Sequence, residues 1–143
     1  MRISAKGRYA LAAVTFMAQH YNSGEYITVI SIAEELGISK IYLEQVFSLL
    51  KKAEIVLSSK GAQGGYQLTR MPEQITVLDV LAAVEVSLFE QAQETVPEKA
   101  PEIEKALRLS VFEVLDESVA KILSWITVAD LGYEADKHKQ GQT

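Results

Sequence analysis

The stretch Ser59-Lys-Gly-Ala-Gln-Gly-Gly-Tyr-Gln-Leu68 decides how this chain of 143 residues folds. Residues 55–59 form a β-branched and polar run that enters a turn with three glycines, and residues 66–69 form a second short run that leaves it. Two such runs around a glycine-rich turn predict a β-hairpin. Its tip carries Lys60, and glycine adds no Cβ, so a nucleic-acid backbone can approach closely. A plain flexible hairpin is the alternative interpretation of the glycines alone.

Two short helical patterns precede this hairpin and meet at Gly37-Ile38-Ser39. Thr28 is placed to cap the first helix, Gly37 to end it in the left-handed conformation, and Ser39 to cap the second. Helix, turn, helix and glycine-rich hairpin follow one another in the order of a winged helix-turn-helix. We therefore predict a mainly α fold with a small β-hairpin.

Further helical patterns flank this unit on both sides. Ser4 and Thr76 are placed to cap the helices that begin directly after them. A later, longer pattern carries apolar residues near a three-four repeat, which is typical of a helix with one buried face. The helices predicted from these patterns cover residues 5–21, 77–86, 102–126 and 128–133.

The composition excludes several kinds of site. The chain has no cysteine, which rules out disulfides, thiol redox chemistry and thiolate-bound clusters. His20 and His138 are far apart in sequence, so we expect no structural zinc and no other cofactor. Without clustered histidines or a phosphate-cradling loop before a helix, we expect no catalytic residue and no enzyme. No apolar run approaches the ~20 residues of a membrane span, and we expect a cytoplasmic protein.

The charge is unevenly divided along the chain. The net charge is −5, but residues 1–72 hold 8 Lys and Arg against 5 Asp and Glu, whereas residues 73–143 hold 6 against 14. A basic N-terminal half on an acidic chain is compatible with local DNA contact. Ordinary charge scatter explains the same division equally well.

The helix that starts after Ser39 has the composition of a recognition helix. A helix fits the major groove with its N-terminal residues at base edges, where glutamine pairs with adenine and glutamate with a cytosine amino group. An ordinary solvated face is the alternative, and the adjoining hairpin favours recognition. The predicted DNA-binding residues, which include the start of the first helix and the hairpin tip, are Arg2, Lys6, Ser39, Tyr42, Glu44, Gln45, Lys60, Gly61 and Gln63.

The long helix has more apolar surface than an outer helix needs. Antiparallel packing on a second copy would bury the stripe and create a two-fold axis, which suits palindromic half-sites about 34 Å apart. Packing on its own domain is the alternative. The predicted dimer interface comprises Ile103, Leu107, Val111, Val114, Leu115, Ile122, Trp125 and Ile126. The predicted organisation is a DNA-binding domain (1–86), a loop (87–101), dimerisation helices (102–135) and a mobile tail (136–143).

Five motifs together resemble one family. They are Ser4-Ala-Lys-Gly-Arg-Tyr-Ala10, Ile38-Ser39, Tyr42-Leu-Glu-Gln45, Lys60-Gly61 and Gly64-Gly-Tyr-Gln-Leu68. In them the chain resembles the IscR/CymR/NsrR (Rrf2) family of bacterial winged helix-turn-helix transcription regulators, clearly over residues 1–86 and beyond that only in its long-helix layout. The resemblance implies a homodimeric repressor on a palindromic operator, with the helix after Ser39 in the major groove. Its signal would be a small-molecule effector or a metabolic enzyme.

The chain departs from that family at several positions. Ile41 stands where relatives often carry a polar residue, which suits a thymine methyl group. Lys60 replaces an arginine and loses its bidentate reach, and Ala62 and Gln63 change the tip. The loop at residues 88–101 lacks the three cysteines of cluster-binding relatives. The chain therefore resembles the cluster-free branch, which includes the cysteine-metabolism repressor that senses a partner enzyme.

Two classes of function compete. The first is a sequence-specific DNA-binding transcription regulator, supported by the order of motifs. The second is a protein-docking regulatory module with little DNA binding of its own, which the acidic C-terminal half favours.

Overall fold

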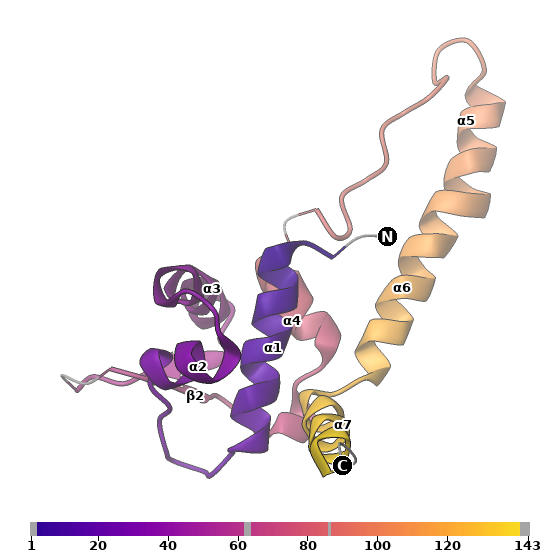
Figure 1. Ribbon diagram of the computed structural model, residues 1–143. Helices are drawn as coiled ribbons and strands as arrows, with labels where there is room; N and C mark the ends of the chain where they lie inside the picture. Colours follow the sequence, from indigo (N-terminus) through magenta and orange to yellow (C-terminus); the bar gives the residue numbers. More distant parts are fainter. Residues whose placement is uncertain (1–2, 62–63, 86, 141–143) are drawn as a thin grey trace.

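A computed structural model describes residues 3–61, 64–85 and 87–140 (Figure 1). It confirms the mainly α fold with one small hairpin. The elements, in chain order, are α1 (Ala5–Gln19), α2 (Val29–Leu36), α3 (Lys40–Lys52), β1 (Val56–Ser58), β2 (Tyr66–Leu68), the 3-10 turn η1 (Pro72–Gln74), α4 (Val77–Val84), α5 (Pro101–Leu107), the π-helical segment η2 (Arg108–Phe112), α6 (Glu113–Trp125) and α7 (Val128–Gln140).

A single core holds the N-terminal elements together. Helices α1, α3 and α4 pack on one another, and α2 and the hairpin close the sides. The apolar stripe of helix α3 is buried in this core, and the opposite face of the helix is exposed. The fully buried residues of that stripe are Leu43, Val46, Phe47 and Leu50.

The helix-turn-helix forms as its capping signals predict. Thr28 accepts a hydrogen bond from the Ser31 amide at 3.2 Å and starts α2. Gly37 ends that helix in the left-handed region, with φ of 65°. Ser39 then accepts from the Tyr42 amide at 3.3 Å and starts α3. These short-range bonds fix the turn between the two helices.

The hairpin is anchored at its base by a third segment. Strands β1 and β2 pair antiparallel, with Val56 opposite Leu68 and Ser58 opposite Tyr66. The Ile27 amide donates to the Tyr66 carbonyl and the Tyr66 amide to the Ile27 carbonyl, each at 2.8 Å. Gly65 has φ of 125°, and a Cβ there would lie 3.1 Å from the Ile27 oxygen. Glycine is therefore required at that position for both reasons.

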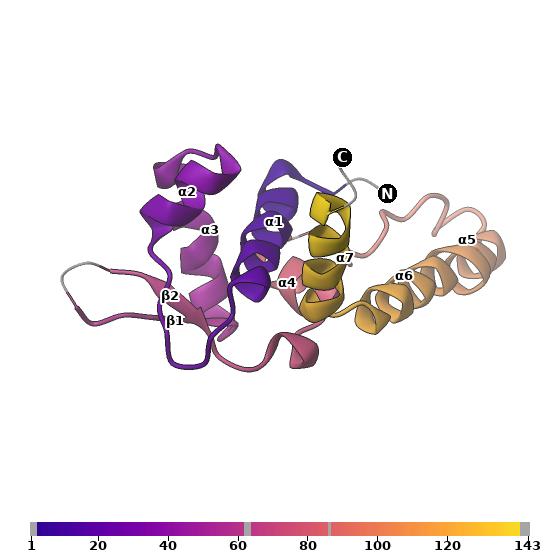
Figure 2. The same cartoon turned by 60° about the horizontal axis from the view of Figure 1, so that its bottom comes forward.

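The predicted long helix is a helical arm with a local distortion. Segments α5, η2 and α6 continue one another, but residues 108–112 are π-helical. The arm contacts α4, and both views show its far end pointing away from α1, α2 and α3 (Figures 1 and 2).

The last helix is longer than predicted. The expected end at residue 133 is wrong, because α7 runs to Gln140 and takes in part of the predicted tail. It packs along α1 (Figure 2), where Val128 is fully buried. Gln19 Nε2 also donates to Asp136 Oδ1 at 2.9 Å. Contact with α1 therefore holds a segment whose own sequence is polar.

Two other boundaries differ slightly from prediction. Helix α1 ends at Gln19 and α4 at Val84, each two residues early. None of the helices in the described residues combines the length and apolar character that a membrane crossing needs.

Candidate nucleic-acid interface

The outer face of α3 is polar near its N-terminus. Glu44 and Gln45 are exposed, and Lys40 Nζ lies 3.7 Å from Glu44 Oε1. Both side chains of that pair are about half exposed, so the pair contributes little to folding. The two side chains are therefore available to other partners at small cost.

Tyr42 and Ser39 have structural partners of their own. Tyr42 is half-buried and packs edge-on against Tyr9 of α1, with ring centroids 5.1 Å apart. The Ser39 hydroxyl accepts the first-turn amide of α3. Glu44 and Gln45 are therefore the predicted contacts in this region whose exposed side chains serve neither the helix cap nor the packing on α1.

A groove runs between α2, α3 and the hairpin of β1 and β2, which we call the wing. It has a volume of about 430 Å³, and Thr28, Lys40, Glu44, Ser59 and Gly61 are among the residues that line it. The groove brings together a helix N-terminus, an exposed ion pair and the base of the wing tip. Segments that lie far apart in sequence thus form one polar surface.

The wing is fixed relative to α3 by ring stacking. Tyr66 of β2 stacks on Phe47 of α3, with centroids 4.6 Å apart and planes 16° from parallel. Phe47 is fully buried in the core. The stacking therefore joins β2 to the buried face of α3.

The described part of the wing tip already uses several of its backbone amides. Lys60 and Gly61 are exposed. The Gly61 amide donates to Ser59 Oγ at 3.1 Å, and the Gly64 amide donates to the Gly61 carbonyl at 3.2 Å. These amides serve a phosphate only if the tip rearranges, whereas the Lys60 side chain is accessible. The predicted contacts at Arg2 and Gln63, and the altered tip residue Ala62, lie outside the described residues.

The start of α1 is held by a residue that sequence reasoning missed. Glu85, just after α4, accepts from the Ser4 amide at 2.9 Å and from Ser4 Oγ at 2.5 Å. A Cβ on Gly7 would overlap Glu85 Oε1. Lys6, a predicted DNA contact, is half-buried in this first turn. No local signal in the sequence links positions 81 residues apart.

The helical arm leaves its apolar stripe uncovered in the single chain. Trp125 is 65% exposed, and Lys121 Nζ lies 5.4 Å from its ring centroid. Leu107 and Ile126 are partly buried. The other predicted interface residues are all exposed, namely Ile103, Val111, Val114, Leu115 and Ile122.

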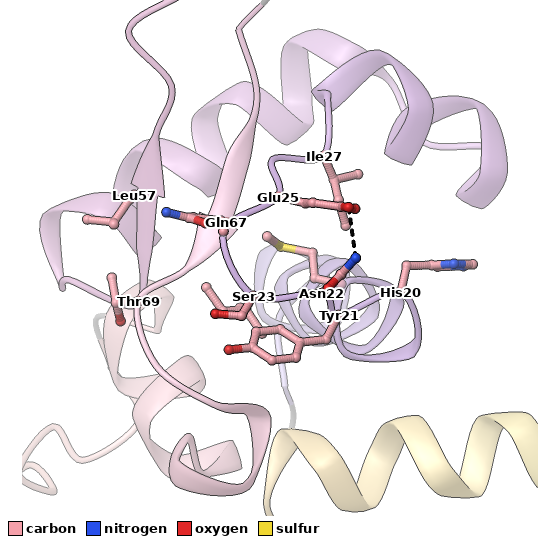
Figure 3. Close-up of a pocket in the computed structure, with 12 residues that line it drawn as sticks. His20, Tyr21, Asn22, Ser23, Glu25, Ile27, Leu57, Gln67 and Thr69 are labelled. Carbon is pink, nitrogen blue, oxygen red and sulfur yellow. Dashed lines mark hydrogen bonds between the residues drawn. The ribbon is translucent and has the colours of Figure 1, made fainter.

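A second pocket lies on the other side of the hairpin (Figure 3). It has a volume of about 260 Å³ between the end of α1, the following loop and both strands. Asn22 Nδ2 donates to Glu25 Oε1 at 2.7 Å across the loop. The ring of His20 lies against Phe16, with centroids 4.3 Å apart, and points away from Leu57 and Gln67 (Figure 3). Among the described residues, none from α3 lines this pocket.

Comparison with known proteins gives one consistent result. A family model described as "Rrf2: Iron-dependent Transcriptional regulator" matches residues 3–134. The regulator IscR of Sodalis glossinidius is 46% identical over 88 residues, which are 62% of this chain and 53% of that protein. This chain thus spans about half the length of several curated relatives that it matches.

Other relatives match over nearly their full length. The HTH-type transcriptional regulator slr0846 of Synechocystis sp. is 34% identical over 99% of this chain and 95% of its own. The structure of CymR, the global cysteine regulator of B. subtilis, is similar with a TM-score of 0.74 and 29% identity, covering 94% of this chain and 98% of that one. These relatives are named as regulators and not as enzymes, in agreement with the sequence-based expectation.

The iron dependence in the family description does not fit the residues of this chain. The sequence has no cysteine and two histidines. His20 is the C-cap residue of α1. On α7, His138 Nε2 lies 3.1 Å from Glu134 Oε1. Within residues 3–61, 64–85 and 87–140, no group of three or more His, Cys, Asp or Glu is placed to hold a metal ion.

Proposed function

The chain belongs to the Rrf2 family of transcriptional regulators, and we propose that it binds DNA in a sequence-specific manner. In this proposal it acts as a homodimeric repressor on a palindromic operator and responds to a small-molecule or protein signal. The N-terminus of α3 enters the major groove, and the wing contacts the adjacent backbone.

The division of α3 into two faces carries this proposal. Its inner face is buried in the core, whereas Glu44 and Gln45 are exposed on its outer face. Glutamine pairs with adenine, and glutamate accepts from a cytosine amino group. Glutamate also repels phosphate, so Glu44 acts in the choice of sequence and adds little affinity.

Lys60 is proposed to add affinity for DNA of any sequence, without selecting between sequences. It is exposed on the wing, and an ammonium group meets phosphate as a point charge. Phosphate contacts position a protein on the duplex, and base contacts specify the sequence. The two kinds of contact therefore come from different elements, the wing and α3.

The arm is proposed to form the dimer. Its exposed stripe includes Leu115, Ile122 and Trp125, and exposed apolar stripes of this kind mark interaction surfaces. Packing against a second arm would bury the stripe and relate two copies of α3 by a two-fold axis. A palindromic operator follows from that symmetry.

The signal is proposed to act through the loop before the arm. Glu104 of α5 accepts from the Thr95 amide at 2.7 Å and the Val96 amide at 2.6 Å, which ties the loop to the arm. A pocket of about 330 Å³ lies between them, and Arg108 and Phe112 of the π-helical segment line it. Distorted helical turns of this type often occur at functional sites.

Selection from random DNA tests the proposed function. The wild-type protein should enrich one palindromic sequence, and its affinity should fall steeply with salt, because each phosphate contact releases counterions. A parallel experiment measures whether the same immobilised chain captures other proteins. Absence of any enriched sequence would contradict the proposal, and protein capture in that case would favour the docking alternative.

A further inference from the structure

Ile41 is the most exposed large hydrophobic side chain in the described residues. Its exposed fraction is 71%, compared with 52% for Ile30 and 65% for Trp125. It is the second residue of α3. Every other apolar residue of that helix is buried or half-buried. One apolar side chain therefore stands alone on the polar face.

Folding does not account for an isoleucine at this position. Ile41 belongs neither to the buried core nor to the apolar residues packed against it. A β-branched residue is also a weaker helix former than alanine or a long polar residue. Water exposure of so much apolar surface is unfavourable, and a contact outside the protomer would bury it.

The neighbours of Ile41 indicate which contact that is. Residues three and four apart share a helix face, so Ile41 lies beside Glu44 and Gln45. Glu44 and the preceding Lys40 line the groove next to the wing. Helical side chains also lean toward the N-terminus, which brings Ile41 to the end of α3 that meets base edges in a helix-turn-helix.

Among the four bases, thymine is the one that presents a methyl group, at C5, in the major groove. We propose that Ile41 is a specificity-determining residue that selects a thymine by contact with that methyl group. The inference rests on the proposed function, because it requires α3 to lie in the major groove. It adds a base preference that the polar residues of α3 do not supply.

The test removes only the methyl group from the DNA. The probe is the duplex that wild-type protein selects from a random library, with thymidine replaced by deoxyuridine at one position at a time. Loss of one buried methyl should weaken binding about fourfold per half-site, at one thymine in each half-site. The same replacement should leave the affinity of Ile41→Ser unchanged, because the variant no longer makes the contact.

Ile30→Ser is the matched control. Ile30 is the second residue of α2, is 52% exposed and lines the groove together with Lys40 and Glu44. This variant should keep the full penalty for deoxyuridine. Circular dichroism should show equal helix content in both variants, since neither side chain is in the core.

Three outcomes distinguish a failure of the proposed role of Ile41 from a failure of the proposed DNA-binding function. Specific binding with no effect of deoxyuridine at any position would overturn the role of Ile41 and leave the proposed function standing. A full deoxyuridine penalty in Ile41→Ser would likewise overturn it, since another residue would then read the methyl. Failure to select any sequence would overturn the proposed function and the role of Ile41 together.

Discussion

Lys60 and Gln45 are proposed to have separate roles, Lys60 in the affinity for DNA and Gln45 in the choice of sequence. Lys60 is on the wing, where it can meet phosphate, and Gln45 is on the exposed face of α3, where it can meet a base edge. Lys60→Ala should weaken binding to all sequences about equally and lower the salt slope by about 1. Gln45→Ala should instead relax preference at one base pair, by roughly tenfold.

Binding of both variants to a set of single-base operator mutants, at several salt concentrations, measures this division. The wild-type protein provides the reference profile. If the two variants lost affinity with the same sequence profile and the same salt slope, the assignment of roles would be wrong.

Gly7 and Glu85 are coupled at the start of α1. An alanine at position 7 would displace the Glu85 carboxylate that Ser4 binds. Gly7→Ala should therefore destabilise the protein by about 1 kcal/mol, despite the better helix propensity of alanine. In a Glu85→Ala background the same change should stabilise by up to roughly 0.5–1 kcal/mol. The overlap with the carboxylate is then gone, and only the Ile3 side chain, whose Cγ2 lies 2.8 Å from the added Cβ, has to shift.

Urea unfolding of the four proteins in this cycle measures the coupling. The change of sign is the diagnostic result. A stabilising Gly7→Ala in the wild-type background would show that Glu85 does not hold Ser4 in solution.

At the scale of elements, α4 and α7 begin side by side with the same cap. Thr76 pairs with Asp79, and Thr127 with Asp130, each through reciprocal hydrogen bonds of 2.9 and 3.0 Å. The Val77 amide also donates to the Ile126 carbonyl at 2.8 Å. The two helix starts are thus joined by a short antiparallel bridge.

One difference between these caps gives a prediction. Asp79 also accepts from Arg70 at 3.0 Å, and Asp130 has no ion pair among those found in the described residues. Asp130→Ala should cost about 1 kcal/mol of unfolding free energy. Asp79→Ala should cost a few tenths of a kcal/mol to about 1 kcal/mol more, because an exposed ion pair is lost as well.

Chemical unfolding of both variants at low and high salt checks this difference. The excess cost of Asp79→Ala should shrink as salt screens the pair. If the excess cost of Asp79→Ala did not change with salt, it would come from packing and not from charge.

Local signals explain why the helix-turn-helix could be predicted and the full length of α7 could not. The caps at Thr28 and Ser39 depend on neighbours three residues away, and Gly37 on its own conformation. The extent of α7 depends instead on α1, through pairs such as Gln19 with Asp136, 117 residues apart. A pattern along one segment does not contain such a contact.

The candidate site divides in the same way. Glu44, Gln45 and Lys60 could be proposed as contacts from the sequence because the order of the motifs places them on α3 and the wing, where they are exposed. Sequence reasoning missed Glu85, and it did not foresee that the Gly61 amide would be bonded to Ser59. Both depend on three-dimensional contacts that neither spacing nor periodicity reports.

At the scale of the whole molecule, a basic N-terminal half is joined to an acidic C-terminal half with an exposed arm. Leu115 is 57% exposed near the middle of that arm. Leu115→Glu should leave the fold intact, since the residue is outside the core, but place a charge in the proposed dimer interface. Sedimentation should then show a monomer, with operator affinity at least about tenfold lower.

Glu117→Ala is the control, because it changes an exposed residue of the same helix without adding a charge to the stripe. It should remain dimeric. A dimeric Leu115→Glu would contradict the assignment of the arm as the interface.

A hydroxyl-radical footprint on the selected operator tests the central claim most directly. The account predicts two protected patches related by a two-fold axis, with centres about 34 Å apart or a multiple of that, and a single protected patch with the monomeric Leu115→Glu variant. Uniform weak protection along the duplex, with no symmetric pair of patches, would contradict it.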